Sequence, residues 1–170
     1  MTRTILSLLL AASATAALAQ SRPWPLTPTG YGPARIGMTR AQVEQALGVA
    51  LQGEPIDSET SCIEMVPVRG DTNIVFMFLE RRLSRIAVVN ESRVRTPRGI
   101  GIGATAAQVR RAYPTGLLAE EHTYTGAPAE YLTFWVRRER SGVRFTTDEN
   151  RRVDTIIAGN GSIQYIEGCA

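Results

Sequence analysis

Apolar and polar residues alternate along several short stretches of this chain, a pattern typical of strands that bury one face. In the clearest case, Leu132, Phe134 and Val136 alternate with polar and amphipathic residues. Turn-forming residues separate these stretches, which indicates antiparallel meanders. The pattern predicts strands at 62–68, 73–80, 83–90, 130–138, 142–147, 152–158 and 162–167.

Two short helices are predicted where this alternation gives way to a helical period. The segments ARIGMTRAQVEQALG (34–48) and IGIGATAAQVRRAYP (100–114) are identical at seven of fifteen positions, at a constant offset of 66 residues. Both contain Thr-x-x-Gln, in which the threonine hydroxyl and the glutamine side chain each accept from the other's backbone N–H and so begin a helix. The four capping residues are Thr39, Gln42, Thr105 and Gln108.

Glycines precede the second helix with the spacing of a dinucleotide-binding loop, Gly101-x-Gly103-x-x-Ala106. The first copy has Arg35 and Arg40 in place of Gly101 and Ala106, so the positions that repeat are not those that a phosphate loop needs. We therefore interpret these glycines as turn residues and expect no nucleotide or other cofactor.

The order of these elements predicts an α+β fold of two tandem repeats, each a short helical element packed on an antiparallel β-meander. Helices of about eight residues are not stable alone, so each should bury its apolar stripe against a sheet. We place the first repeat at 34–95 and the second at 96–170, after a Pro- and Gly-rich lead-in at 20–33.

Residues 1–19 have the pattern of a secretory signal peptide, with one arginine, an apolar run and Ala17-x-Ala19 before Gln20. The apolar run is too short and too rich in Ala and Ser for a membrane span. No cysteine follows the cleavage site to carry a lipid anchor. We expect a periplasmic or secreted protein without a membrane anchor.

The chain has two cysteines, Cys62 and Cys169. In an oxidising compartment an even pair is most simply a disulfide, which here would join the first repeat to the end of the chain. A metal-binding or redox pair would call for a C-x-x-C spacing or supporting histidines, which this sequence lacks.

Arginine supplies all 19 Lys+Arg residues against 16 acidic residues, a formal charge of +3. Paired arginines such as Arg81-Arg82 and Arg110-Arg111 are typical of solvated faces and hairpin tips, and we expect no nucleic-acid partner. An all-arginine composition favours bidentate contacts with anions, but coding bias explains it equally well.

No pattern in the sequence makes a strong case for catalysis. His122, the single histidine, lies beside Glu120 and Glu121 but lacks the i, i+4 spacing and the second histidine of a zinc site. The residues around Ser162 do not form a nucleophile elbow. We expect neither a metal site nor an enzyme, and a hydrolase ranks third among the possible functions.

The alternation in 130–138 also defines a second set of side chains, opposite Leu132 and Phe134. If the helix covers the aliphatic side, this second set faces outward, and Tyr, Trp and Arg are common at binding hot spots. The alternative is that Tyr131 and Trp135 pack against the first repeat or against the lead-in with its Trp24. The candidate binding residues are Tyr131, Thr133, Trp135, Arg137 and Arg144.

The helix-start motif IGMTRAQVEQALG resembles that of the SmpA/OmlA-like family, the small outer-membrane lipoproteins of the β-barrel assembly machinery. Two such units in a secreted chain with a disulfide resemble the β-lactamase inhibitory protein fold. That resemblance implies helical segments on one side of a sheet whose other face is free to bind. The chain lacks the lipoprotein anchor cysteine and has one cysteine pair, so neither family's partner is carried over.

These patterns predict a non-catalytic binding module of the protein-interaction or inhibitor type, acting through an open sheet face. The expected partner is an envelope or extracellular protein. The alternative is a small-ligand or envelope-glycan binding protein, in which arginines and aromatic residues line a cleft. An anionic envelope glycan is the candidate ligand of that alternative.

Overall fold

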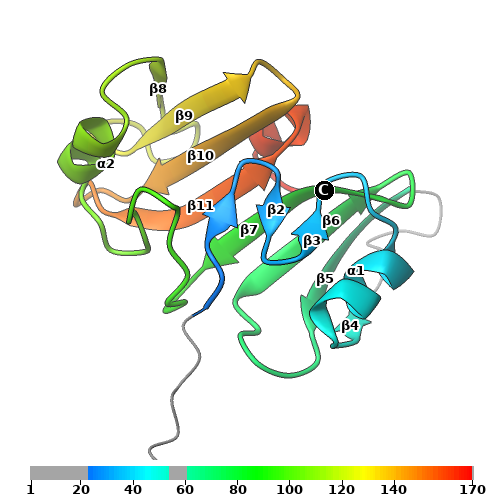
Figure 1. Ribbon diagram of the computed structural model, residues 1–170. Coiled ribbons are helices and arrows are strands. Elements are labelled where there is room, and N and C mark those ends of the chain that lie inside the picture. The colour runs from blue at the N-terminus through cyan, green and yellow to red at the C-terminus, as the bar shows by residue number, and fades with distance from the viewer. Residues whose placement is uncertain (1–22, 54–60, 170) are drawn as a thin grey trace, which may run out of the picture.

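The computed structural model describes residues 23–53 and 61–169, so the predicted signal peptide lies outside the described residues. An eight-stranded antiparallel sheet dominates the fold, in the order β4-β5-β6-β7-β11-β10-β9-β8 (Figure 1). Its strands are β4 (Leu51–Gln52), β5 (Cys62–Pro67), β6 (Ile74–Leu79), β7 (Arg82–Val89), β8 (Leu117–Glu121), β9 (Glu130–Arg137), β10 (Ser141–Thr147) and β11 (Val153–Gly159). The other elements are the small sheet β1 (Leu26–Thr27), β2 (Gly30–Tyr31) and β3 (Ala34–Arg35), the helices α1 (Arg40–Leu47) and α2 (Ala106–Ala112), and the 3₁₀ helix η1 (Gly161–Gln164).

The predicted division into two helix-on-meander repeats is wrong. Strand β7 pairs with β11 over five residue pairs, from Arg85↔Gly159 to Val89↔Thr155. This pairing crosses the expected boundary between the repeats and joins their strands into one sheet. The described residues therefore form a mostly antiparallel β structure with two short α-helices rather than two separate α+β layers.

Six of the seven predicted strands are present, with each end at most one residue from its predicted position. The seventh is wrong, because the chain forms η1 at the start of 162–167 instead of a strand. Strand β8 lies within the segment expected to be a loop, and the lead-in contributes β1 and β2. Short-range alternation thus locates the long strands but not the short or exposed ones.

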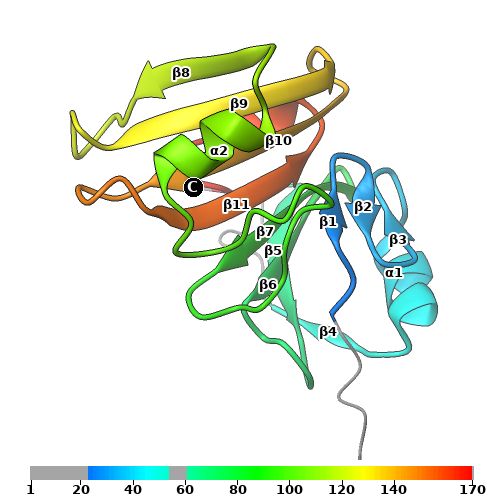
Figure 2. The same ribbon diagram turned by 60° about the vertical axis from the view of Figure 1, so that its left-hand side comes forward.

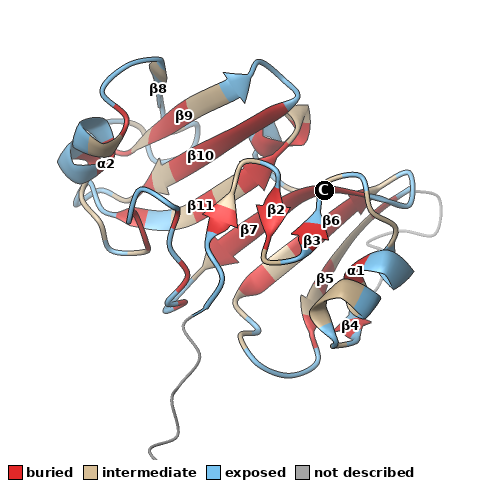
Figure 3. Cartoon of the chain, viewed as in Figure 1, coloured by how far each residue is buried: buried red, intermediate tan, exposed pale blue. Residues whose placement is uncertain are grey.

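Both α-helices and the small sheet pack on the same face of the large sheet (Figure 2). One core cluster unites Val43 of α1, Val109 of α2 and Ala34 of β3 with Phe76 and Phe145 of the large sheet, all of them fully buried. Figure 3 shows that burial extends along most of the central strands. Removing this apolar surface from water is the main stabilising term.

Both helices begin with a capping box. The Thr39 hydroxyl accepts from the Gln42 N–H at 3.3 Å, and the Gln42 side chain accepts from the Thr39 N–H at 2.9 Å. The corresponding distances at Thr105 and Gln108 are 3.2 and 2.7 Å. These bonds satisfy donors that would otherwise be unpaired in the first turn.

The opposite face of the large sheet, here called the outer face, is crossed by the C-terminal segment. Arg85 on this face donates to the carbonyl oxygens of Ser162 and Tyr165. The predicted disulfide is present and joins Cys62 to Cys169, 107 residues apart. No helix among residues 23–53 and 61–169 is long and apolar enough to cross a membrane.

Candidate functional site

The outer face does not present the predicted binding residues as one open surface. Tyr131, Thr133 and Arg144 are only 5%, 1% and 5% exposed, whereas Trp135 is half-buried and Arg137 is exposed. Alternation does place them on the face opposite the helices, as expected. The prediction that this set is open is wrong for Tyr131, Thr133 and Arg144, which other groups cover, whereas Arg137 is exposed as expected.

Aromatic and guanidinium groups supply this cover. The His122 ring stacks on the Tyr131 ring with centroids 4.7 Å apart, and the guanidinium carbon of Arg144 lies 3.9 Å from the Tyr131 centroid. Trp135 lies over Gly142, where an added Cβ would come within 2.5 Å of the indole. These residues therefore pack on their own strands rather than against the first half of the chain.

His122 also orders the loop that contains it. Its Nδ1 accepts from the backbone N–H groups of Tyr124 and Thr125, at 3.3 and 3.2 Å. Within the described residues, no group of three or more His, Cys, Asp or Glu side chains could hold a metal ion. The contacts of His122 are those of a structural residue in a turn.

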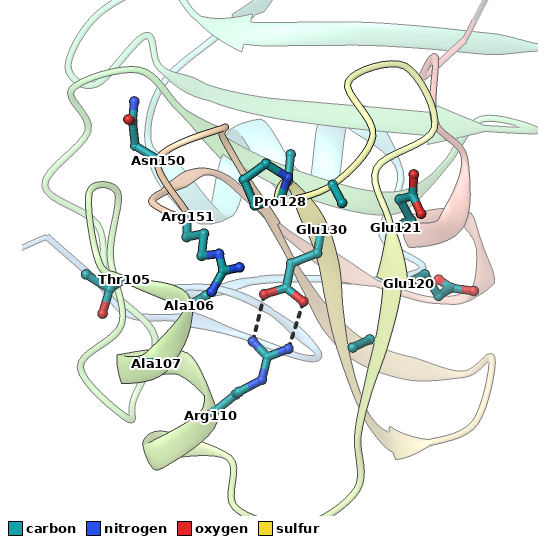
Figure 4. Close-up of a pocket in the computed structure, with 13 residues that line it drawn as sticks. Thr105, Ala106, Ala107, Arg110, Glu120, Glu121, Pro128, Glu130, Asn150 and Arg151 are labelled. Atoms are coloured by element: carbon teal, nitrogen blue, oxygen red, sulfur yellow. Dashed lines mark hydrogen bonds and ion pairs between the residues drawn. The ribbon is translucent and has the colours of Figure 1, made fainter.

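One pocket, about 820 Å³ in volume, lies between α2, β8 and the loop that leads into β9 (Figure 4). Arg110 and Glu130 face each other in its wall and form two bonds of 2.7 Å each. The hydrogen bonds to Glu130 raise the pKa of the Arg110 guanidinium. Because this bidentate pair is satisfied internally, these two groups are largely committed to each other rather than to a ligand.

A second pocket, about 640 Å³, lies against the other flank of α2 and is lined by four arginines. We call it the arginine pocket and define it by Arg95, Arg98, Arg111 and Arg152. No carboxylate lines it, and none of the four arginines forms an ion pair with a carboxylate of the described residues. The side chain of Gln108 adds an amide to the wall.

Three of the four arginines are anchored by the backbone, each through Nη1. The acceptors are Gly99 O for Arg95 at 2.9 Å, Ala112 O for Arg98 at 2.7 Å and Gly103 O for Arg152 at 3.0 Å. These side chains are exposed, and each guanidinium has five N–H donors, so one bond to the backbone restrains the group and leaves most of its donors available. This arrangement lowers the entropic cost of binding an anion.

Arg98 is held further by aromatic rings. Its guanidinium carbon lies 4.4 Å from the Tyr113 centroid and 5.0 Å from the Phe134 centroid, within the range of cation–π attraction. Tyr113 is buried in the core, and this burial raises the pKa of its phenol. Arg98 therefore connects the rigid core to the wall of the pocket.

Sequence reasoning missed this pocket because it treated the arginine pairs one at a time, as solvated faces. The four side chains come from the segment before α2, from α2 itself and from the turn before β11, and only the fold brings them together. Comparison of the two copies of the repeated motif could have indicated the pocket, because arginines are found in or just before the second copy where the first has uncharged residues. At the offset of 66 residues, Arg98 and Arg111 correspond to the uncharged Gly32 and Gln45.

The fold and this site describe a class of protein, a mostly antiparallel β structure with a basic pocket beside a short helix. No protein-family model and no curated protein matches the chain. A solved structure is similar: the 1.5 Å crystal structure of an extracellular protein containing an SCP domain, from Bacillus anthracis strain Ames.

That similarity has a TM-score of 0.50 and a sequence identity of 12%. It covers 92% of this chain and 52% of the other, so this chain spans about half the length of the protein it matches. At this identity the likeness shows a common fold and nothing about the ligand.

Proposed function

We propose that this protein is a secreted or periplasmic, non-catalytic binding module that holds an anionic molecule in the arginine pocket. The ligand class is a carboxylated or phosphorylated component of the cell envelope, such as an anionic glycan. We favour this small-ligand role over a protein-interaction role.

One observation carries the proposal: four arginines converge on one pocket that no carboxylate from the described part of the chain lines. Like charges gathered without counter-ions raise the electrostatic free energy of the folded protein, and a bound anion relieves that repulsion. The planar guanidinium also matches carboxylate and phosphate oxygens through paired N–H groups.

Other observations support the compartment. Disulfides such as Cys62–Cys169 persist in oxidising environments, and the similar solved structure is described as an extracellular protein. The signal-peptide pattern at 1–19 agrees with secretion. An envelope or extracellular location would expose the arginine pocket to anionic glycans.

Isothermal titration of the oxidised protein with inorganic phosphate and with an oligogalacturonate tests the proposal. We expect saturable binding that weakens as salt is added, since the contacts are ionic. The Arg111→Gln variant should bind about tenfold more weakly, the loss of one charge-assisted contact. The double variant Arg95→Gln/Arg111→Gln should show no measurable binding.

Arg138→Gln is the matched control. It removes the same charge at a side chain that is 85% exposed, between β9 and β10 and outside the arginine pocket. Affinity equal to that of the unaltered protein is expected. An equal loss in Arg138→Gln and Arg111→Gln would mean that the anions respond to net charge alone, and the pocket would not be the site.

A protein partner is the second candidate, and one observation favours it. At the end of β9, Val136 is 59% exposed, and its chain neighbours Trp135 and Arg137 are half-buried and exposed, so this strand end offers apolar, aromatic and guanidinium groups to a partner. Affinity capture from envelope extract, with Val136→Ala/Arg137→Ala as the control bait, tests it. A partner retained by both baits would contradict this placement.

A further inference from the structure

The outer face holds two arginines that are buried to almost the same degree. Arg85 on β7 is 6% exposed and Arg144 on β10 is 5% exposed. A buried cation is destabilising unless hydrogen bonds and counter-ions replace the water it has lost. The two residues therefore face the same physical requirement on the same sheet.

Arg85 meets this requirement. Its Nη1 donates to the Ser162 and Tyr165 carbonyl oxygens at 3.2 and 2.7 Å, and its Nη2 pairs with the Glu64 carboxylate at 3.0 Å. The C-terminal segment and β5 thus supply one counter-ion and two neutral acceptors. This guanidinium is compensated within the chain.

Arg144 does not meet it. Among the described residues its polar contact is one carboxylate oxygen of Glu120, at 3.5 Å, and the Glu120 side chain is 56% exposed. Burial lowers the pKa of the Arg144 guanidinium, against the opposing influence of Glu120. The guanidinium has five N–H donors, and the one long contact to a solvent-exposed carboxylate satisfies few of them.

Two further polar atoms beside Arg144, the Tyr131 hydroxyl and the Thr133 Oγ1, are buried and have no hydrogen-bond partner among residues 23–53 and 61–169. The Arg144 guanidinium carbon lies 3.9 Å from the Tyr131 ring centroid, and Thr133 is the direct cross-strand partner of Arg144. Side chains directly opposite each other have Cβ atoms about 5 Å apart. The guanidinium can only donate and each hydroxyl can donate as well, so the cluster has more N–H and O–H donors than the single Glu120 carboxylate oxygen satisfies.

We propose that this cluster binds the carboxylate group of a small organic acid. Two guanidinium N–H groups of Arg144 would take the two carboxylate oxygens, and the Tyr131 and Thr133 hydroxyls would donate to the remaining lone pairs. In the structure the Glu120 carboxylate makes one 3.5 Å contact with the Arg144 guanidinium. The carboxylate of the ligand would replace it, and Glu120 would move toward solvent.

This carboxylate site is separate from the arginine pocket. Val143 and Phe145, the neighbours of Arg144 on β10, are buried in the core cluster that contains Val109 of α2. Because side chains alternate along a strand, Arg144 points to the other face of the sheet. The two sites can therefore be altered independently.

Titration with sodium acetate, at constant ionic strength with chloride as the balancing anion, tests the proposal. Heat of binding and the melting temperature are the readouts, and the variants replace Glu120 or Thr133 because replacing Arg144 risks unfolding the protein. Glu120→Gln should bind acetate about fivefold more tightly, since it removes the competing charge. Thr133→Val should bind about tenfold more weakly, since it removes one hydrogen bond to a charged group.

The melting temperatures of the acetate-free variants separate a binding role from a structural one. Thr133→Val should melt at the same or a higher temperature than the unaltered protein, because it replaces an unsatisfied buried hydroxyl by a methyl group of similar shape. Arg111→Gln, in the arginine pocket, should leave acetate binding to this cluster unchanged. Weaker or equal acetate binding by Glu120→Gln, or a lowered melting temperature of Thr133→Val, would overturn the proposal.

Discussion

The surroundings of α1 and α2 are built alike at the helix start and differently along the helix. Before α1, Gly37 N–H donates to Leu83 O at 2.7 Å and Leu83 N–H donates to Met38 O at 2.8 Å. Before α2, the same pair of bonds joins Gly103, Val153 and Ala104 with the same two distances. The repeated sequence motif therefore encodes one way of attaching a helix start to a strand.

We call this attachment of a helix start to a strand the junction. In both junctions an arginine adds a hydrogen bond. Arg82 Nη1 donates to the Gly37 carbonyl at 3.3 Å, and Arg152 Nη1 donates to the Gly103 carbonyl at 3.0 Å. Arg152 also lines the arginine pocket. A structural contact shared by both halves thus becomes part of a candidate binding site in one half.

The two helices differ in the charges beside these junctions. Arg40 of α1 pairs with Glu44 one turn later, at 2.9 Å. At α2, Arg111 takes the position of Gln45 and forms no ion pair within the described residues. The repeated motif therefore carries structure, while three of the four arginines of the pocket, Arg95, Arg98 and Arg111, have no basic counterpart in the first copy.

Because both helices are attached in the same way, we expect their buried valines to contribute equally to stability. Val43 and Val109 are both 0% exposed in one core cluster. Val43→Ala and Val109→Ala should each lower the free energy of unfolding by about 2 kcal/mol, from lost burial and the cavity left behind. Urea denaturation measures both. A difference above about 1 kcal/mol would mean that the helices are packed unequally.

Removing either cap should have the next largest effect. Thr39→Ala and Thr105→Ala each leave an unpaired donor in the first turn and should cost about 1 kcal/mol. Thr39→Ser and Thr105→Ser keep the hydroxyl and serve as controls, with most of the stability retained. Equal destabilisation by Ala and Ser would show that packing of the threonine methyl group, and not the cap, is what matters.

Local pattern was enough to predict the caps and most strands, because both depend on residues close together in the sequence. Strand β8 was missed because four of its five residues are exposed and show no alternation. The segment at 162–167 was misassigned because the Asn160 side chain accepts from the Ser162 N–H and starts η1. The β7–β11 pairing depends on residues about 70 apart, from Arg85↔Gly159 to Val89↔Thr155, and no local pattern reveals it.

The candidate sites were harder to predict for the same reason. The alternation in β9 and β10 predicted which face Tyr131, Thr133 and Arg144 occupy, but not that His122 and Arg144 would cover Tyr131. The arginine pocket depends on three separate segments meeting beside α2. The resemblance to the β-lactamase inhibitory protein fold and to the SmpA/OmlA-like motif stays a prediction.

Replacing the junction arginines should separate structure from binding. Arg82→Gln and Arg152→Gln each lose one hydrogen bond to a glycine carbonyl, and each should lower the free energy of unfolding by about 0.5–1 kcal/mol. Only Arg152→Gln should also weaken the binding of phosphate or oligogalacturonate. Weaker binding in both variants would place the anion site outside the arginine pocket.

The smallest expected effect is a pH-dependent contribution of Glu44 to stability. Glu44 lies in α1, and α2 has no carboxylate at the corresponding position. The hydrogen bond from the backbone N–H of Leu51, together with Arg40, lowers the pKa of the Glu44 carboxyl below its ordinary value. A lowered folded-state pKa adds stability above the unfolded pKa, and this stability is lost as the pH falls through the folded pKa. Glu44→Gln should therefore be less stable than the unaltered protein at pH 7, by about 0.5 kcal/mol, and the difference should shrink below pH of about 4.

Denaturation across this pH range measures the effect, with Glu149→Gln, on the exposed turn before β11, as the control for removing one negative charge. Position 110, the counterpart of Glu44 at the offset of 66, is an arginine that stays charged throughout the range. A pH-independent difference for Glu44→Gln would mean that the uncharged amide lacks a contact that both forms of the carboxyl make. The Glu44 contribution would then be packing, and the contrast between the two helices would rest on the arginine pocket alone.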